Sequence, residues 1–204
     1  MSESTAAGLP AWEQTLTVTT ADQTHALGAA LGEVLRAGDL LVLTGELGAG
    51  KTTFTQGLGE GLGVRAGIIS PTFVLVRIHP NLPDGPRPGG PDLVHVDAYR
   101  LGSASEIDDI DLENTLDSSV TVVEWGRGRV EHLTESRLEV DLHRAIGLDS
   151  VGAAAAPAAP IPGHTETLDF DTDDHDEPRT IVMRGFGPRW STRPVLGNAF
   201  EGTP

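Results

Sequence analysis

A phosphate-binding sequence carries the clearest chemistry in this chain. Residues 45–52 read GELGAGKT and match the pattern G-x-x-x-x-G-K-[ST] in full. Lys51 is also the only lysine among the 204 residues, and every other basic side chain is Arg or His. A compact, strongly hydrated ammonium suits the β- and γ-phosphates of a nucleotide. The sequence therefore predicts a nucleoside triphosphate site.

The residue types of this loop fit that chemistry one by one. Glycines let the backbone N–H groups approach an anion without obstruction by a Cβ atom, and the hydroxyl of Thr52 can bind Mg²⁺. We predict that the nucleotide is bound by a run of six residues: Gly48, Ala49, Gly50, Lys51, Thr52 and Thr53.

This loop needs a strand before it and a helix after it. Residues 39–44 form a short apolar run suited to a buried parallel strand. The residues from Lys51 onward read as a helix whose positive N-terminal end faces the anion. A chance match in a Gly-rich chain is the alternative, and the flanking elements disfavour it.

Two further predicted strands end in a carboxylate. Residues 93–97 end at Asp97, and residues 120–124 end at Glu124. In open α/β sheets the ligand crevice lies at the carboxyl ends of the strands, so both side chains are expected to face the nucleotide. We assign Mg²⁺ binding to Thr52 and Glu124, and orientation of water to Asp97. The opposite assignment of the two carboxylates stays open, and ordinary strand-end carboxylates are the alternative.

Other side chains near these strands have several interpretations. Ser70 and Thr72, in a β-rich stretch over 68–78, are placed to sense a γ-phosphate as switch segments do, although turn or capping hydrogen bonds explain them equally well. His95 is expected to pack or hydrogen-bond on its strand rather than bind metal. Trp125 is expected in the core rather than as a lid beside the site.

Composition divides the chain into one folded domain and less structured segments. We expect a flexible N-terminal tail over 1–13, the folded domain over 14–148, its final strand over 179–190 and a C-terminal tail over 191–204. Residues 149–178 are Ala/Pro-rich and then acidic, which predicts a disordered insertion that cannot bury a core. Further predicted elements are a strand at 15–19, a helix from a capping box at 20–23 to Gly38, an exposed loop at 81–91, an acidic helix at 105–116, and strands at 137–143 and 180–185.

The overall charge restricts the classes of partner. Asp and Glu number 30 against 14 Lys and Arg, which gives a formal net charge of −16. Such a surface repels nucleic-acid backbones and anionic membranes. The chain has no cysteine, so disulfides and thiolate catalysis are excluded. No apolar run approaches the ~20 residues of a membrane span, and we expect a soluble, cytoplasmic protein that contacts no membrane.

Four short segments together resemble the TsaE (YjeE) family of bacterial P-loop ATPases. They are GELGAGKTTF at 45–54, SPTF at 70–73, HVDAYRL at 95–101 and VEW at 123–125. Their order and spacing agree with the family over roughly residues 15 to 145. The resemblance implies an α/β fold: the three-layer P-loop NTPase fold, with a mostly parallel central sheet that carries antiparallel strands at one end.

The resemblance also implies a function. The family uses ATP and Mg²⁺ and is required to make threonylcarbamoyladenosine beside the anticodon of tRNA. Its members dock on a TsaB–TsaD heterodimer, hydrolyse ATP weakly alone and better in the complex, and reach tRNA only through that complex. By position, Lys51, Asp97 and Glu124 would be the catalytic residues, Thr52 and Glu124 would bind magnesium, and the segment with Ser70 and Thr72 would be switch-like.

Three other functions are alternatives to this one. A GTPase reads guanine with an Asn/Thr-Lys-x-Asp motif, which is absent because the only lysine lies in the phosphate loop. A small-molecule P-loop kinase would need an acceptor pocket and an arginine-bearing lid, and no clear segment provides either. A nucleotide-sensing interaction module would differ from an ATPase only in its rate of turnover.

Overall fold

The strand that precedes the phosphate loop lies at the centre of the sheet. In the computed structural model, which describes residues 8–101, 103–108, 110–144 and 177–196, this strand is β2 (Leu40–Thr44). It pairs in parallel with β5 (Ser119–Glu124) on one side and with β6 (Arg137–Arg144) on the other. Leu41 and Leu43 belong to one hydrophobic cluster, whereas Leu40 and Val42 belong to another. Both faces of β2 are therefore buried, as its continuous apolar sequence predicts.

The other strands extend this centre in both directions. They are β1 (Trp12–Val18), β3 (Val76–His79), β4 (Asp92–Asp97) and β7 (Arg179–Phe186). The described residues form a sheet with the order β1-β7-β6-β2-β5-β4-β3. The pairs β1–β7 and β6–β7 are antiparallel, which confirms the predicted parallel centre with antiparallel strands at one end. β3 is also antiparallel to β4, so the opposite edge carries an antiparallel strand that the prediction did not include.

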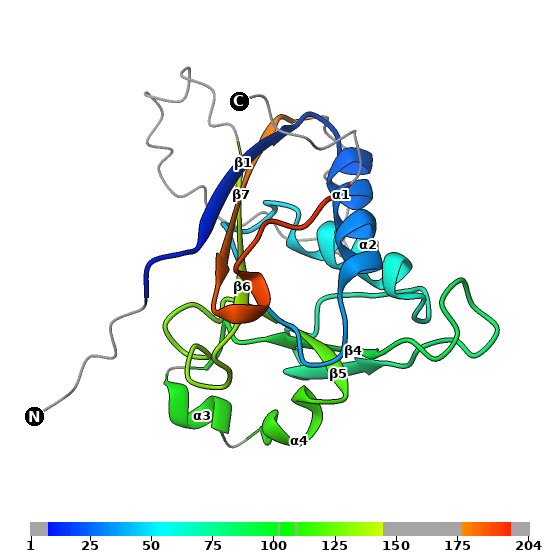
Figure 1. Ribbon diagram of the computed structural model, residues 1–204, viewed down its shortest axis with the longest axis vertical. Helices are drawn as coiled ribbons and strands as arrows, with labels where there is room; N and C mark the ends of the chain where they lie inside the picture. Colours follow the sequence, from blue (N-terminus) through cyan, green and yellow to red (C-terminus); the bar gives the residue numbers. More distant parts are fainter. Residues whose placement is uncertain (1–7, 102, 109, 145–176, 197–204) are drawn as a thin grey trace, which may run out of the picture.

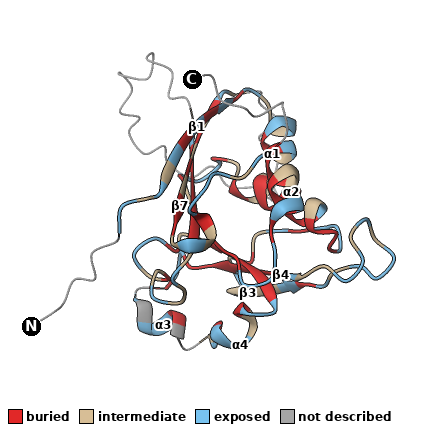
Figure 2. Ribbon diagram, in the orientation of Figure 1, coloured by how far each residue is buried: buried red, intermediate tan, exposed pale blue. Residues whose placement is uncertain are grey.

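Helices cover the sheet on two sides and complete the three layers. α1 (Ala21–Val34) and α2 (Lys51–Leu62) lie side by side on one face (Figure 1). The short helices α3 (Ala104–Asp108) and α4 (Glu113–Leu116) contribute to the second cluster, on the other face. The buried residues concentrate in the strands and on the inner sides of α1 and α2 (Figure 2).

Glycines bring α1 and α2 into backbone contact. A Cβ atom on Gly57 would lie 2.0 Å from the carbonyl oxygen of His25, and one on Gly28 would lie 2.2 Å from that of Phe54. Gly32 and Gly61 make the same kind of contact one turn further along. Since no side chain fits at these four positions, they determine how closely α1 packs against α2, the helix that begins at Lys51.

α1 begins as predicted and ends earlier than predicted. Gln23 N donates to Thr20 Oγ1 at 3.1 Å, and Thr19 N donates to Gln23 Oε1 at 2.7 Å, which is a capping box. The helix does not reach Gly38, because Leu35 is already extended (φ −71°, ψ 153°). The guanidinium of Arg87 donates to the carbonyl oxygens of Gly32 and Leu35 and so satisfies this helix end.

Two other predicted elements are shorter than expected. Within 68–78 only residues from Val76 onward are in a strand, because Val74 N and Leu75 N donate to Pro71 O in a turn and Leu75 has a φ of 67°. The acidic segment 105–116 forms α3 and α4 rather than one helix. Asp111, between them, has a φ of 56°, a left-handed conformation that interrupts a helix.

The domain boundaries also differ slightly from those predicted. β1 begins at Trp12, where the indole Nε1 donates to Trp190 O at 2.8 Å. The short helix η1 (Pro188–Trp190) follows β7, and Leu196, which we expected in the tail, is 8% exposed within the core cluster. The predicted insertion 149–178 lies outside the described residues except for 177 and 178. None of the described helices combines the length and the apolar character that a membrane crossing needs.

Candidate nucleotide-binding site

The phosphate loop connects β2 directly to α2. Gly50 precedes the helix with a φ of 96°, and Gly48 has a φ of 77°, both in the left-handed region that favours glycine. A Cβ atom on Gly45 would lie 2.4 Å from Leu142 O, so β6 also restricts this position to glycine. The predicted strand, loop and helix are therefore present in the expected order. The open N-terminal end of α2 offers its backbone N–H groups to an anion.

A cavity of about 720 Å³ opens over this loop. It is lined by all but one of the residues predicted to form the site: Gly48, Gly50, Lys51, Thr52, Thr53, Ser70, Thr72, Asp97 and Glu124. The exception is Ala49, which is fully buried and packs against Gly45 within the loop. These lining residues come from four segments that lie far apart in the sequence.

Lys51 is folded onto its own loop. The ammonium Nζ donates to Gly45 O at 2.9 Å and to Glu46 O at 3.0 Å, and it lies 4.3 Å from the centre of a Trp125 ring. Burial lowers the pKa of Lys51 from its ordinary value, and the negative charges of Glu124, Asp97 and Glu46 oppose this shift. These carbonyl contacts hold the ammonium in the wall of the cavity.

Asp97 connects the two hydroxyl residues to the site. Its Oδ2 accepts from Thr72 Oγ1 at 2.7 Å and from Ser70 Oγ at 3.2 Å. Its Oδ1 accepts from the backbone N of Tyr99 at 2.9 Å. Ser70 and Thr72 are therefore hydrogen-bonded to the carboxylate of Asp97. The sequence did not reveal this contact.

Glu124 lies beside Asp97 on the neighbouring strand. The two residues are register partners at the carboxyl ends of β5 and β4, and each is 3% exposed. His95 Nε2 lies 2.9 Å from Glu124 Oε1, and His95 is completely buried. This contact agrees with the expectation that His95 hydrogen-bonds on its strand. The paired strands place two carboxylates side by side opposite the phosphate loop.

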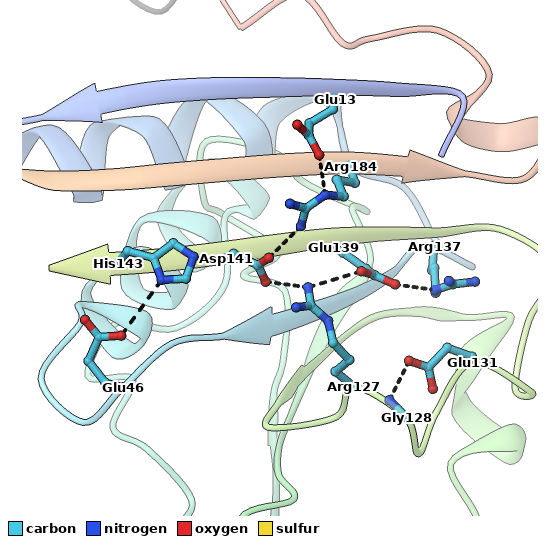
Figure 3. A network of polar contacts seen from close by, with 10 residues as sticks. All are labelled: Glu13, Glu46, Arg127, Gly128, Glu131, Arg137, Glu139, Asp141, His143 and Arg184. Atoms are coloured by element: carbon cyan, nitrogen blue, oxygen red, sulfur yellow. Dashed lines mark hydrogen bonds and ion pairs between the residues drawn. The ribbon is translucent and has the colours of Figure 1, made fainter. Parts of the chain in front are cut away.

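The segment after Glu124 forms part of the cavity wall. Trp125, expected in the core, is instead only partly buried, lines the cavity and has a φ of 61°. Arg129 Nη1 donates to Ala98 O at 2.6 Å, which ties this segment to the one after Asp97. Arg127 pairs with Glu139 and Asp141 of β6 and ties the same segment to that strand, as Figure 3 shows. The backbone around Trp125 is thus fixed by ion pairs and hydrogen bonds.

Sequence reasoning missed several residues of the cavity wall. They are Ala21, Glu46, Leu47, Tyr99, Trp125 and Arg179. Tyr99 lies two residues after Asp97, and its ring makes an edge contact with Trp125 at 5.4 Å between centroids. The motif around Asp97 offered a signal for Tyr99. Arg179 had none, since it follows a segment of biased composition and begins the last strand.

Three comparisons bear on this site. Residues 18–148 match the family model described as "Threonylcarbamoyl adenosine biosynthesis protein TsaE". The chain is 49% identical over 170 residues to the tRNA threonylcarbamoyladenosine biosynthesis protein TsaE of Streptomyces coelicolor, which covers 83% of this chain and 95% of that protein. It is 38% identical over 125 residues to the protein of the same name from Bacillus subtilis, which covers 61% of this chain and 73% of that protein.

A solved structure agrees with the fold. The crystal structure of YdiB from Bacillus subtilis superposes with a TM-score of 0.57 at 26% sequence identity, and the match covers 88% of this chain and 89% of that one. The matched family residues contain the phosphate loop, Asp97 and Glu124. On these grounds the chain belongs to the TsaE family of threonylcarbamoyladenosine biosynthesis proteins.

Proposed function

We propose that this protein binds Mg-ATP in the cavity and hydrolyses it in support of threonylcarbamoyl transfer to tRNA. The observation that carries this proposal is the position of Asp97 and Glu124 at paired strand ends, in the wall of the cavity that the phosphate loop also lines. A triphosphate site needs a lysine, backbone N–H donors and acidic groups for a metal and a water, and this cavity has all of them.

The binding step follows from the loop. The ammonium of Lys51 leaves the carbonyl oxygens of Gly45 and Glu46 for the β- and γ-phosphates, and the N–H groups from Gly48 to Thr53 hold the phosphate chain. The buried position of Lys51 strengthens this attraction, because little water screens it. The N-terminal end of α2 adds its positive dipole.

Magnesium fits the oxygen ligands that the cavity offers. The hydroxyl of Thr52 and the carboxylate of Glu124 both line it, and Mg²⁺ in nucleotide sites is commonly held by one or two such groups together with phosphate oxygens. When bound, the ion would neutralise charge that develops on the phosphates. His95 holds Oε1 of Glu124 and restricts the rotation of that carboxylate.

In hydrolysis, Asp97 would orient the attacking water. Its carboxylate can accept a hydrogen bond from the attacking water and orient it toward the γ-phosphorus atom. Ser70 and Thr72 already donate to this carboxylate, so any contact they form with a γ-phosphate would weaken their bonds to Asp97. The segment with Ser70 and Thr72 would therefore report the presence of the γ-phosphate to the residues around it.

The proposed protein partner follows from membership of the TsaE family. We propose that the protein acts with a TsaB–TsaD heterodimer and reaches tRNA only through that complex, since its formal charge of −16 disfavours direct contact with a phosphodiester backbone. We also propose that residues 149–178 form an insertion outside the ATPase domain.

The test is ATP hydrolysis by the purified protein with Mg²⁺ when no other substrate is present. Phosphate release above that of Lys51→Ala supports the ATPase. Turnover that appears only when a small-molecule acceptor is added would indicate a kinase instead. Tight ATP binding with no turnover, alone or with the heterodimer, would indicate a nucleotide-sensing module.

A further inference from the structure

A second cation lines the cavity at the end away from the carboxylates. Arg179 is the first residue of β7, and it is 5% exposed. In the sheet, β7 lies beyond β6 on one side of β2, whereas β5 and β4 lie on the other side. Arg179 and the pair Asp97 and Glu124 therefore belong to opposite sides of the phosphate loop.

The guanidinium of Arg179 is incompletely satisfied by the protein. Nη1 donates to Glu177 O at 3.1 Å, but the buried Nε has no hydrogen-bond partner among the described residues. We also find no carboxylate paired with this side chain in the part of the chain that the structure describes. A buried, charged donor without an acceptor is unfavourable by itself, which points to an anion as the missing partner.

The side chain of Arg179 lies against the phosphate loop. A Cβ atom built on Gly50 would be 3.4 Å from Arg179 Nε and 3.6 Å from Arg179 Cδ. Gly50 is the residue directly before Lys51 and the start of α2. The unpartnered Nε is therefore within reach of an anion held by the first N–H groups of that helix.

The order of the phosphates along the loop indicates which phosphate would lie beside Arg179. The lysine of such a loop reaches the β- and γ-phosphates, and the Mg²⁺ ligands lie at the same end. In this cavity that end is defined by Asp97 and Glu124. The backbone N–H groups at the start of the helix hold the α- and β-phosphates. Arg179, on the opposite side, is thus placed at the α-phosphate.

We propose that Arg179 donates from its guanidinium to the α-phosphate of the bound nucleotide. This inference rests on the proposed function and names a residue of its binding site. Arg179 would determine affinity for the nucleotide and would take no part in the reaction at the γ-phosphate. It would supply the second positive charge of a cavity whose only other described cation is Lys51.

The test compares Arg179→Gln and Arg179→Lys with the wild-type chain by calorimetric titration of ATP and of ADP in the presence of Mg²⁺. Loss of a charged hydrogen bond predicts that Arg179→Gln raises both dissociation constants by roughly tenfold or more, and by similar factors. Arg179→Lys should recover part of the affinity. At saturating ATP, kcat of Arg179→Gln should stay within about twofold of the wild-type value.

Arg144→Ala is the matched control, since Arg144 ends β6 close to Arg179 and pairs with Glu177. Thermal unfolding checks that each variant is folded. Unchanged affinities in a folded Arg179→Gln protein would overturn the assignment, as would a loss confined to ATP or a large fall in kcat. If the wild-type protein itself bound neither nucleotide, the proposed function would fail instead.

Discussion

The imidazole Nε2 of His95 lies 2.9 Å from Oε1 of Glu124, between two adjacent buried strands. The other ring nitrogen, Nδ1, has no hydrogen-bond partner among the described residues. A proton on Nε2 is therefore favoured, because it is donated to the carboxylate and no N–H is left without an acceptor. In this state His95 holds one oxygen of Glu124 and leaves the second for the cavity.

Replacing His95 tests this positioning role. We predict that His95→Leu lowers ATP turnover or apparent Mg²⁺ affinity by roughly ten- to hundredfold, as loss of an outer hydrogen-bond partner does at metal sites. Affinity for ATP without Mg²⁺ should change little. The measurement is the hydrolysis rate as a function of Mg²⁺ concentration. His79→Leu is the control, since His79 is also buried but its Nε2 has no hydrogen-bond partner among the described residues. Equal behaviour of the two variants would refute the role of His95.

Substitutions of Lys51 and Asp97 should have different effects on ATP binding and on ATP turnover. Lys51→Ala removes the ammonium that reaches the phosphates, so ATP binding should be abolished. Asp97→Ala should leave ATP binding intact and lower turnover by about 10²- to 10⁴-fold, the usual effect of removing a group that acts on the attacking water. Asp92→Ala, at the exposed beginning of the same strand, is the control for β4. Equal loss of ATP binding in Lys51→Ala and Asp97→Ala would contradict the role given to Asp97.

The glycine contact between α1 and α2 should be sensitive to a single methyl group. Gly57→Ala places a Cβ atom 2.0 Å from His25 O, so the two helices must separate. The expected loss is about 1–3 kcal/mol in the free energy of unfolding, typical of overpacking. Denaturant unfolding measures it, and Gly8→Ala, with nothing within 4 Å, is the control. Unchanged stability would show that the helices move apart without strain.

His79 predicts a pH dependence of stability. Burial lowers its pKa, and electrostatic repulsion from His95, when that ring is protonated, and from Arg77 lowers it further. Below the ordinary value of about 6.5 the unfolded chain binds a proton that the folded chain does not, so the free energy of unfolding falls as the pH falls from 6.5 toward the folded-state pKa. His79→Leu should reduce this decline between pH 7 and 5 in urea titrations. An identical decline in both proteins would assign it to other groups.

Local patterns were sufficient for most of the site. The loop motif predicted the strand, the glycine-rich turn and the helix, because each depends on neighbouring residues. Strand ends predicted that Asp97 and Glu124 meet, since parallel strands align their carboxyl ends. The class of fold followed from the family resemblance, with which the strand, loop and helix of the phosphate-binding motif agree.

Contacts between distant segments were not predictable in this way. The bonds from Ser70 and Thr72 to Asp97 depend on a turn at Pro71 that a β-rich composition concealed. Arg179 reaches the phosphate loop through a strand order that places β7 beyond β6. The end of α1 at Val34 depends on Arg87, which lies more than fifty residues away in a loop expected to be exposed. Each of these requires knowledge of the tertiary structure.

The most direct test of the central claim is the rate of ATP hydrolysis with Mg²⁺, measured for the protein alone and with a TsaB–TsaD heterodimer from the same organism. We predict a low rate alone and a higher rate with the heterodimer, and we predict that both disappear in Lys51→Ala. A rate that the heterodimer does not change, or a stimulated rate that persists in Lys51→Ala, would contradict a partner-stimulated ATPase at this site.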